Sequence, residues 1–245
     1  MPQVRQVAIN NRLLLALQPS TLERLRAALE PMAIARGQTI DRVNVPIEHL
    51  YFVNCGLIST VKTMRDGRSV EVSAVGVEGL TDPYSLFGLD AAVLDTIVQI
   101  PGDVFRIRRE VLIRAMSLDG SLRQIIQDYA RFAFGELAQT AACNRLHSLE
   151  ERCCRWLLVA QDSALADRFP LTHEFLAMML GVQRSGVSIT ARALKTAGFI
   201  DYTRAQVKIL NRRGLEATAC ECYQTSQDEL NVLFAPSLGR LHSAT

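Results

Sequence analysis

The spacing of apolar residues between positions 170 and 210 changes from a helical period to a strand period. Thr172 can cap a helix over 172–180, in which apolar residues recur at intervals of three and four. Gly181 suits a left-handed turn, and a second helix over about 183–197 turns Val187, Ala191 and Leu194 inward.

The same stretch meets the steric requirements of a winged helix-turn-helix. Small Ala177 allows the two helices to cross closely, Gly181 makes the turn, and Val187 fills the angle between the helices. Two β-prone runs follow, 199–202 and 207–210, and the turn 203–206 between them predicts a wing.

The first half of the chain has a different pattern. Residues 11–29 predict an amphipathic helix that is interrupted at Pro19 and Ser20. From about residue 32 to 108, runs rich in valine, isoleucine and aromatic residues alternate with turn residues. The expected strands are 49–53, 57–62, 70–75, 96–100 and 104–108. This cadence predicts an antiparallel barrel or roll.

A long helix over about 120–144 is predicted between these two parts. Its apolar positions have heptad spacing, and the seam consists of Leu122, Ile126, Tyr129, Ala133, Leu137, Thr140 and Asn144. We favour pairing of this seam with a second copy over packing on the chain's own roll, because helix-turn-helix proteins commonly read two-fold symmetric half-sites. Further helices are expected over 149–160 and 221–233, with a polar connection over 162–168.

The predicted fold class is therefore α+β, with an N-terminal antiparallel β-roll of jelly-roll type, a long helix and a C-terminal winged helix-turn-helix. The predicted domains are an N-terminal helix and sensory roll over 1–118, a dimerisation or linker helix over 119–147, and a DNA-binding part with a C-terminal helix over 148–245.

The net charge of the chain says little about its partners, but the distribution of basic residues along the chain is informative. The chain has 245 residues and a net charge of +2, but residues 172–215 contain seven basic and two acidic side chains. Such a patch suits duplex phosphates, because each neutralised phosphate releases counterions. The alternative is a solvated polar face on a protein-interaction module, but the turn spacing and the wing favour DNA.

The N-terminus lacks a secretory pattern, and no apolar run approaches the roughly 18 residues that span a bilayer. We expect a cytoplasmic protein that does not contact a membrane and whose cysteines are reduced. Phosphate-binding, serine-hydrolase, zinc-protease and dinucleotide motifs are all missing from the sequence, so we do not expect an enzyme.

The order of the elements resembles the superfamily of the cyclic-AMP receptor protein and the fumarate-nitrate regulator (CRP/FNR) across nearly the whole chain. The resemblance is best in LTHEFLAMMLGVQRSGVSITARALKTAGFI, and AQTAACNRLHSLEERCCRWLL is similar to a branch that does not bind cyclic AMP. It implies a homodimeric transcription regulator with a cyclic-nucleotide-binding-like roll that reads an inverted-repeat operator in double-stranded DNA. It leaves RNA polymerase and a small-molecule effector open as further partners.

The predicted DNA contacts lie at the start of the second helix and on the wing. The residues are Thr172, Gln183, Arg184, Ser185, Ser188, Ile189, Arg192 and Lys208. Arg184 is the best candidate base reader, because a guanidinium can bond guanine O6 and N7 together. The resemblance assigns phosphate contacts to Thr172 and Arg192. Relatives usually have an acid where Ser185 stands, so the target sequence should differ from theirs.

The roll lacks the ionic groups that would bind a cyclic nucleotide. Leu80 stands at the usual carboxylate position, and no arginine occurs between Arg68 and Arg106. The candidate effector pocket is Glu78, Gly79, Leu80 and Asp82. Two interpretations of the roll stay open: it binds a less charged effector, or it is vestigial and binds none.

The cysteines do not form a recognisable cofactor motif. The first is Cys55, so the early cysteine group of an iron-sulfur sensor is missing, and no haem or metal site is expected. Cys153–Cys154 and Cys220–Cys222 are too closely spaced to supply good zinc geometry as isolated pairs. We favour buried structural thiols, with a cysteine-based redox-responsive regulator as the alternative.

Overall fold

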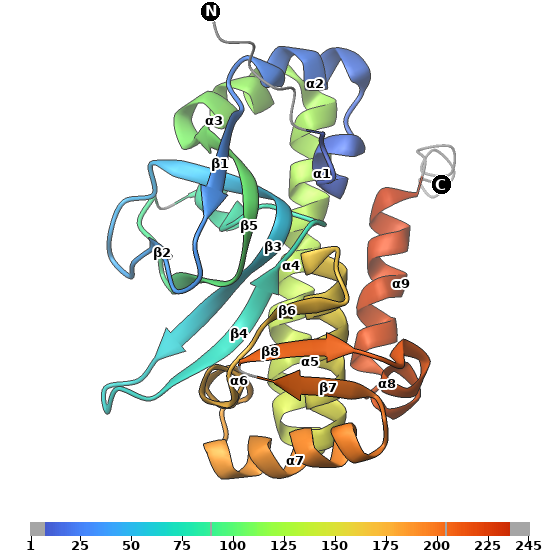
Figure 1. The fold of residues 1–245 in the computed structure, drawn as a ribbon. Helices are drawn as coiled ribbons and strands as arrows, with labels where there is room; N and C mark the ends of the chain where they lie inside the picture. Colours follow the sequence, from blue (N-terminus) through green and yellow to red (C-terminus); the bar gives the residue numbers. More distant parts are fainter. Residues whose placement is uncertain (1–7, 89, 204, 236–245) are drawn as a thin grey trace, which may run out of the picture.

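A computed structural model describes residues 8–88, 90–203 and 205–235 of the chain. A β-roll lies at the upper left of Figure 1, the long helix α4 runs down the middle, and a smaller sheet with its helices lies at the bottom. The last helix, α9, lies beside α4 on the right. The predicted class and order of elements are confirmed.

The N-terminal half holds short helices and the antiparallel sheet of the roll. The elements are α1 Arg12–Leu15, α2 Pro19–Arg26, β1 Glu30–Ile34, β2 Thr39–Asp41, β3 His49–Thr63, β4 Ser69–Val75, η1 Pro83–Phe87 and β5 Asp95–Arg108. The strand order is β1-β5-β3-β4, and β2 also pairs with β5. The predicted interruption at Pro19 is confirmed, because Pro19 begins α2.

Two pairs of strands that the sequence predicts as separate are continuous. β3 contains both 49–53 and 57–62, and β5 contains both 96–100 and 104–108. The turn-forming residues between the runs produce register shifts instead of strand ends. Gly56 has a φ of 102°, and a Cβ there would lie 2.7 Å from the carbonyl oxygen of Ile100. Glycine therefore allows the bulged strands to stay paired.

The long helix packs against its own roll. After α3 (Arg109–Leu118), the Asp119 side chain caps α4 (Gly120–Leu146) by accepting from the backbone amides of Ser121 and Leu122. Leu122, Ile126 and Tyr129 are at most 1% exposed and belong to the core of the roll. The prediction that this seam faces a second copy is therefore wrong for these three residues.

The opposite face of α4 is open and has its own four-and-three spacing. We call it the exposed α4 stripe, and it consists of Gln127, Arg131, Phe134, Ala138, Ala141 and Arg145. Sequence periodicity cannot choose between these two faces, because the choice depends on what the roll covers.

The C-terminal part is a small sheet surrounded by helices. Its elements are α5 Leu149–Ala164, β6 Arg168–Pro170, α6 His173–Leu180, α7 Arg184–Thr196, β7 Ile200–Thr203, β8 Gln206–Ile209, α8 Arg212–Thr218 and α9 Cys222–Phe234. The sheet order is β6-β8-β7. The predicted helix-turn-helix and wing are confirmed, whereas β6 and α8 were not expected. None of the described helices has the length and apolar character needed to cross a membrane.

The roll and the C-terminal part share one apolar core. Leu57, Val61 and Ile100 of the roll cluster with α5, α6 and α7. Buried Glu71 of β4 lies in this contact, where it accepts hydrogen bonds from the Ser59 hydroxyl and from Trp156 Nε1, the latter at 3.5 Å. Burial raises the pKa of Glu71 from its ordinary value of 4.5 to about 7.

This burial predicts a pH-dependent interface. Protonated Glu71 is favoured in the folded state, so its stabilising effect is full below pH 4.5 and is lost as the pH rises through about 7. Glu71→Gln should remove this loss, which amounts to about 3 kcal/mol at most. Trp156 is the single tryptophan, so its fluorescence between about pH 5 and 8 reports the titration.

Exposed Glu23 provides the control through Glu23→Gln, which should keep the wild-type titration. A fluorescence titration that survives unchanged in Glu71→Gln would contradict the assignment.

Candidate nucleic-acid interface

The helix-turn-helix is assembled by local caps and a tight helix crossing. Thr172 Oγ1 accepts from the amide of Phe175 at 3.2 Å and so begins α6. Gly181 ends α6 with a φ of 64°, in the left-handed region that favours glycine. Ala177 and Val187 are buried between the helices. The three predicted packing roles are confirmed, and one face of α7 is buried against α6.

The free side of α7 presents most of the predicted contact residues. Gln183 precedes the first turn, and Arg184, Ser185, Ile189 and Arg192 are exposed along the helix. Figure 1 shows α7 at the lower edge of the molecule, away from the roll. This face mixes hydrogen-bonding groups with the 71% exposed Ile189, the kind of surface that reads base edges and thymine methyl groups.

Ser188 lies differently from its neighbours. Its hydroxyl donates to the carbonyl oxygen of Arg184 at 3.0 Å and lies 3.0 Å from Nδ1 of His173. The ring of His173 stacks on Tyr202 of the wing at 4.4 Å, and burial lowers the pKa of His173. Ser188 therefore joins α6, α7 and the wing. Sequence reasoning missed His173, whose role depends on the three-dimensional contact with Tyr202.

Thr172 is also engaged by the roll. Arg36 donates to Thr172 Oγ1 at 3.3 Å, and its guanidinium lies 4.8 Å from the ring centroid of Phe175. A groove between these elements is lined by both the turn after β3 and the residues of α6. In this arrangement, a phosphate at Thr172 would have to share the hydroxyl with Arg36 or displace it.

The basic residues of the wing region are not equivalent. Lys208 is exposed on β8, where it can reach a phosphate. Lys195 forms an ion pair with Asp201 at 2.7 Å, so its charge is partly neutralised. Arg204 lies outside the described residues. Lys208 is therefore better placed to meet a phosphate than Lys195 is.

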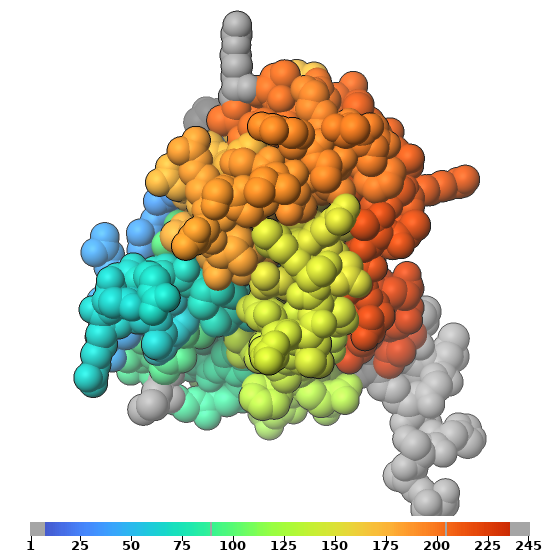
Figure 2. All heavy atoms as spheres, turned by 90° about the horizontal axis from the view of Figure 1, so that it is seen from below, coloured from blue at the N-terminus to red at the C-terminus, as the bar shows by residue number. Residues whose placement is uncertain are grey.

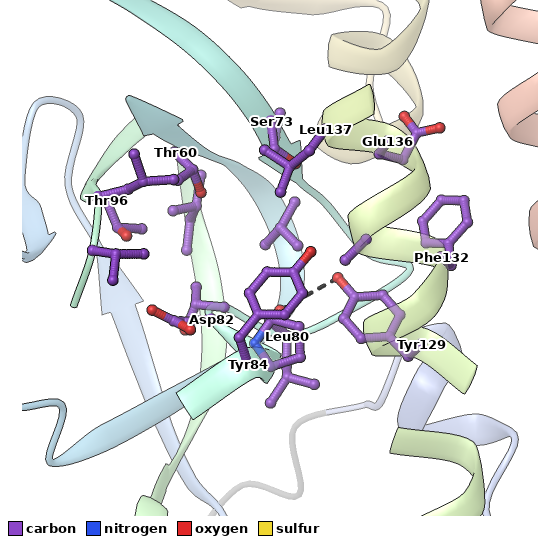
Figure 3. Close-up of a pocket in the computed structure, with 18 residues that line it drawn as sticks. Thr60, Ser73, Leu80, Asp82, Tyr84, Thr96, Tyr129, Phe132, Glu136 and Leu137 are labelled. Carbon is purple, nitrogen blue, oxygen red and sulfur yellow. Dashed lines mark hydrogen bonds between the residues drawn. The ribbon is translucent and has the colours of Figure 1, made fainter. Parts of the chain in front are cut away.

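A second candidate site is a cavity between the roll and α4 (Figure 3). Tyr84, Tyr129 and Phe132 form much of its apolar wall, and Tyr129 Oη donates to the carbonyl oxygen of Leu80 at 3.3 Å. Asp82 and Glu136 are acidic, and among the described residues that line the cavity none is basic. Burial raises the pKa of both carboxyl groups. The cavity therefore disfavours an anionic ligand.

The structure brings only part of the predicted effector pocket to this cavity. Leu80 and Asp82 line it, whereas Glu78 and Gly79 do not. Glu78 accepts from the amide of Gly76 at 2.7 Å, and a Cβ on Gly79 would lie 1.8 Å from Tyr129 Oη. Glu78 and Gly79 thus shape the backbone beside the cavity.

Five of the six cysteines form two groups, and Cys55 lies apart from both in β3. Cys153 and Cys154 are buried in α5, as expected for structural thiols. Cys143, Cys220 and Cys222 lie together with His147, although the sequence separates the two ends of the group by more than seventy residues. The sequence spacing of neighbouring cysteines could not reveal this cluster, because Cys143 and His147 come from the end of α4 and the residue after it.

Comparison with known proteins assigns the C-terminal part. The family described as Crp-like helix-turn-helix domain matches residues 151–218. Residues 151–218 therefore form a Crp-like helix-turn-helix domain. No curated protein matches the chain in sequence.

Three solved structures have a similar fold. FixK2 from Bradyrhizobium japonicum has a TM-score of 0.66 at 18% identity, and the match covers 78% of this chain and 98% of FixK2. A CRP-family transcriptional regulator from Thermus thermophilus has a TM-score of 0.64 at 23% identity, with 77% and 96% covered. The c-di-GMP responsive regulator CLP of Xanthomonas campestris has a TM-score of 0.62 at 18% identity, with 78% and 99% covered. At these identities the likeness concerns the fold.

A base contact by Arg184 and a phosphate contact by Lys208 predict different effects of substitution on DNA affinity and specificity. Arg184→Ala should reduce discrimination between a preferred duplex and a scrambled one by about 5- to 150-fold, because it removes a contact to a base. Lys208→Ala should weaken binding to both duplexes alike and reduce the salt slope by about 1, because it removes a contact to a phosphate. Fluorescence anisotropy over a salt series measures both.

Arg26→Ala on α2 removes a charge far from this surface and serves as the control. The assignment fails if Arg184→Ala leaves binding to every duplex unaffected.

Proposed function

We propose that this chain is a dimeric, sequence-specific transcription regulator in the cytoplasm and not an enzyme. Each copy places α7 in a major groove of an inverted-repeat operator, while Lys208 and Arg192 contact phosphates. The observation that carries the proposal is the exposed polar face of α7 on a buried helix-turn-helix support. The position of the operator relative to the promoter, and any contact with RNA polymerase, would decide between activation and repression.

The exposed α4 stripe is the proposed dimer contact. Phe134 lies at its centre and is 66% exposed, and Ala138 and Ala141 beside it would allow a second helix to approach closely. Figure 2 shows this part of α4 uncovered between the β3–β4 hairpin and the C-terminal helices. A large apolar side chain among small residues at heptad spacing is typical of a helix-pairing face.

The cavity in the roll is the proposed effector site. Its acidic and aromatic lining suits a neutral or cationic compound with an apolar body rather than a phosphate. The cavity is lined by α4 and by β4, and β4 also packs on α6. A ligand that prefers one position of these elements would shift the arrangement of the two α7 helices.

The direct test is a selection of bound sequences from random duplexes with full-length protein at fixed, near-physiological salt. The proposal predicts an inverted repeat that is bound at least about 10³-fold more tightly than scrambled DNA. Equal binding to selected and scrambled duplexes would refute sequence-specific recognition. An absence of DNA binding would favour a protein-interaction module.

Dimerisation has a separate prediction. Phe134→Glu should convert the dimer to a monomer, because it places a charge in the centre of the apolar contact, and sedimentation velocity measures this change. Affinity for the full inverted repeat should fall strongly, while binding to a single half-site should persist.

Leu118→Glu is the matched control, since Leu118 is 85% exposed but lies outside the exposed α4 stripe. A Phe134→Glu protein that stays dimeric would show that another surface joins the copies.

A further inference from the structure

Four potential metal ligands converge where the long helix meets the last helix. Cys143 lies in the final turn of α4, and His147 follows that helix directly. Cys222 is the first residue of α9, and Cys220 lies two residues before it. One ligand atom from each of the four lies within 4.8 Å of every other. The three cysteines are at most 4% exposed, and His147 is half-buried.

Two of the separations between ligand atoms match those around a tetrahedral ion. Zinc binds thiolate at about 2.3 Å and imidazole at about 2.0–2.1 Å, so tetrahedral angles place two sulfurs roughly 3.8 Å apart and a sulfur and a nitrogen roughly 3.5 Å apart. The Sγ atoms of Cys143 and Cys220 are 3.6 Å apart, and Cys222 Sγ is 3.5 Å from His147 Nδ1. Both pairs have the spacing of neighbouring ligands of one ion.

The surrounding groups also suit a metal centre. His147 Nε2 lies 3.2 Å from a carboxylate oxygen of Glu221, which would hold Nδ1 unprotonated and directed at the cysteines. The side-chain amide of Gln139 donates to Cys222 Sγ at 2.9 Å, a contact that stabilises a thiolate. A group of ordinary buried thiols requires neither partner.

We propose that Cys143, His147, Cys220 and Cys222 bind one divalent ion of the zinc class in each chain. Three thiolates and one imidazole form a closed structural site, and this donor set selects zinc over calcium or magnesium. The ion would link the end of α4 to the start of α9. It would thus join the proposed dimer helix to the helix-turn-helix domain through α8 and α9.

The spacing of Cys220 and Cys222 does not oppose this assignment. Two ligands separated by one residue are poor as an isolated pair, but here Cys143 of α4 and His147 directly after that helix supply the other two ligands, four residues apart. The site therefore combines two short local pairs through the tertiary fold.

The first test measures metal in the full-length protein after reduction, loading with Zn²⁺ and removal of excess ion. We expect about one zinc per chain, and zinc should raise the melting temperature because it binds only the folded site. His147→Ala, Cys220→Ser and Cys222→Ser should lose bound zinc. Cys55→Ser is the matched control, since Cys55 lies in β3 outside the cluster.

Loading with Co²⁺ gives a readout that does not depend on DNA binding. The wild-type protein and Cys55→Ser should both show the strong visible absorption of tetrahedral cobalt and the near-ultraviolet band of thiolate ligands. His147→Ala, which removes the least buried ligand, tests the site even where a cysteine variant fails to fold.

The proposal is overturned if reduced wild-type protein retains no zinc and its melting temperature is unchanged. It is also overturned if His147→Ala and the folded cysteine variants retain the wild-type zinc content.

Discussion

The burial of one face of α4 against the roll is the packing interaction on which the rest of the molecule depends. Ile126 and Tyr129 are enclosed by apolar residues from the N-terminal helices and from β3 and β5. Because this face is committed within the chain, the opposite face is left to solvent, and the end of the helix is directed at the C-terminal part. The exposed α4 stripe, the roll cavity and the cysteine cluster all take their positions from this single contact.

The same contact explains how a roll without ionic anchors could still act on DNA binding. Tyr129, Phe132 and Glu136 of α4 line the cavity, so an occupant would press directly on the helix proposed to join two copies. On the other side, β4 touches α6, and Arg36 binds Thr172. The roll therefore contacts the helix-turn-helix directly at two places, through β4 on α6 and through Arg36 on Thr172. Neither contact requires a phosphate-binding cassette.

Features set by neighbouring residues could be predicted from the sequence. The cap at Thr172, the turn at Gly181 and the plug at Val187 depend on spacing within one short segment, and the structure has all three. Features that depend on distant partners could not. From the sequence alone, Gly56 indicates a strand end, but in the structure it allows the close approach of Ile100 within a continuous strand pair. Likewise, the spacing at Leu122 predicts a dimer contact, but the roll covers this residue. The cysteine and histidine cluster brings Cys143 against Cys220 through a tertiary contact that leaves no signature in the sequence.

In the proposed dimer, two copies joined along the exposed α4 stripe present their α7 helices to one face of a duplex. Hydroxyl-radical footprinting on the selected operator tests this arrangement most directly. Such a dimer should protect two segments that are related by two-fold symmetry and separated by about one helical turn, roughly 34–36 Å, or a multiple of it. A single protected segment, or protection without helical phasing, would contradict the arrangement of the two copies.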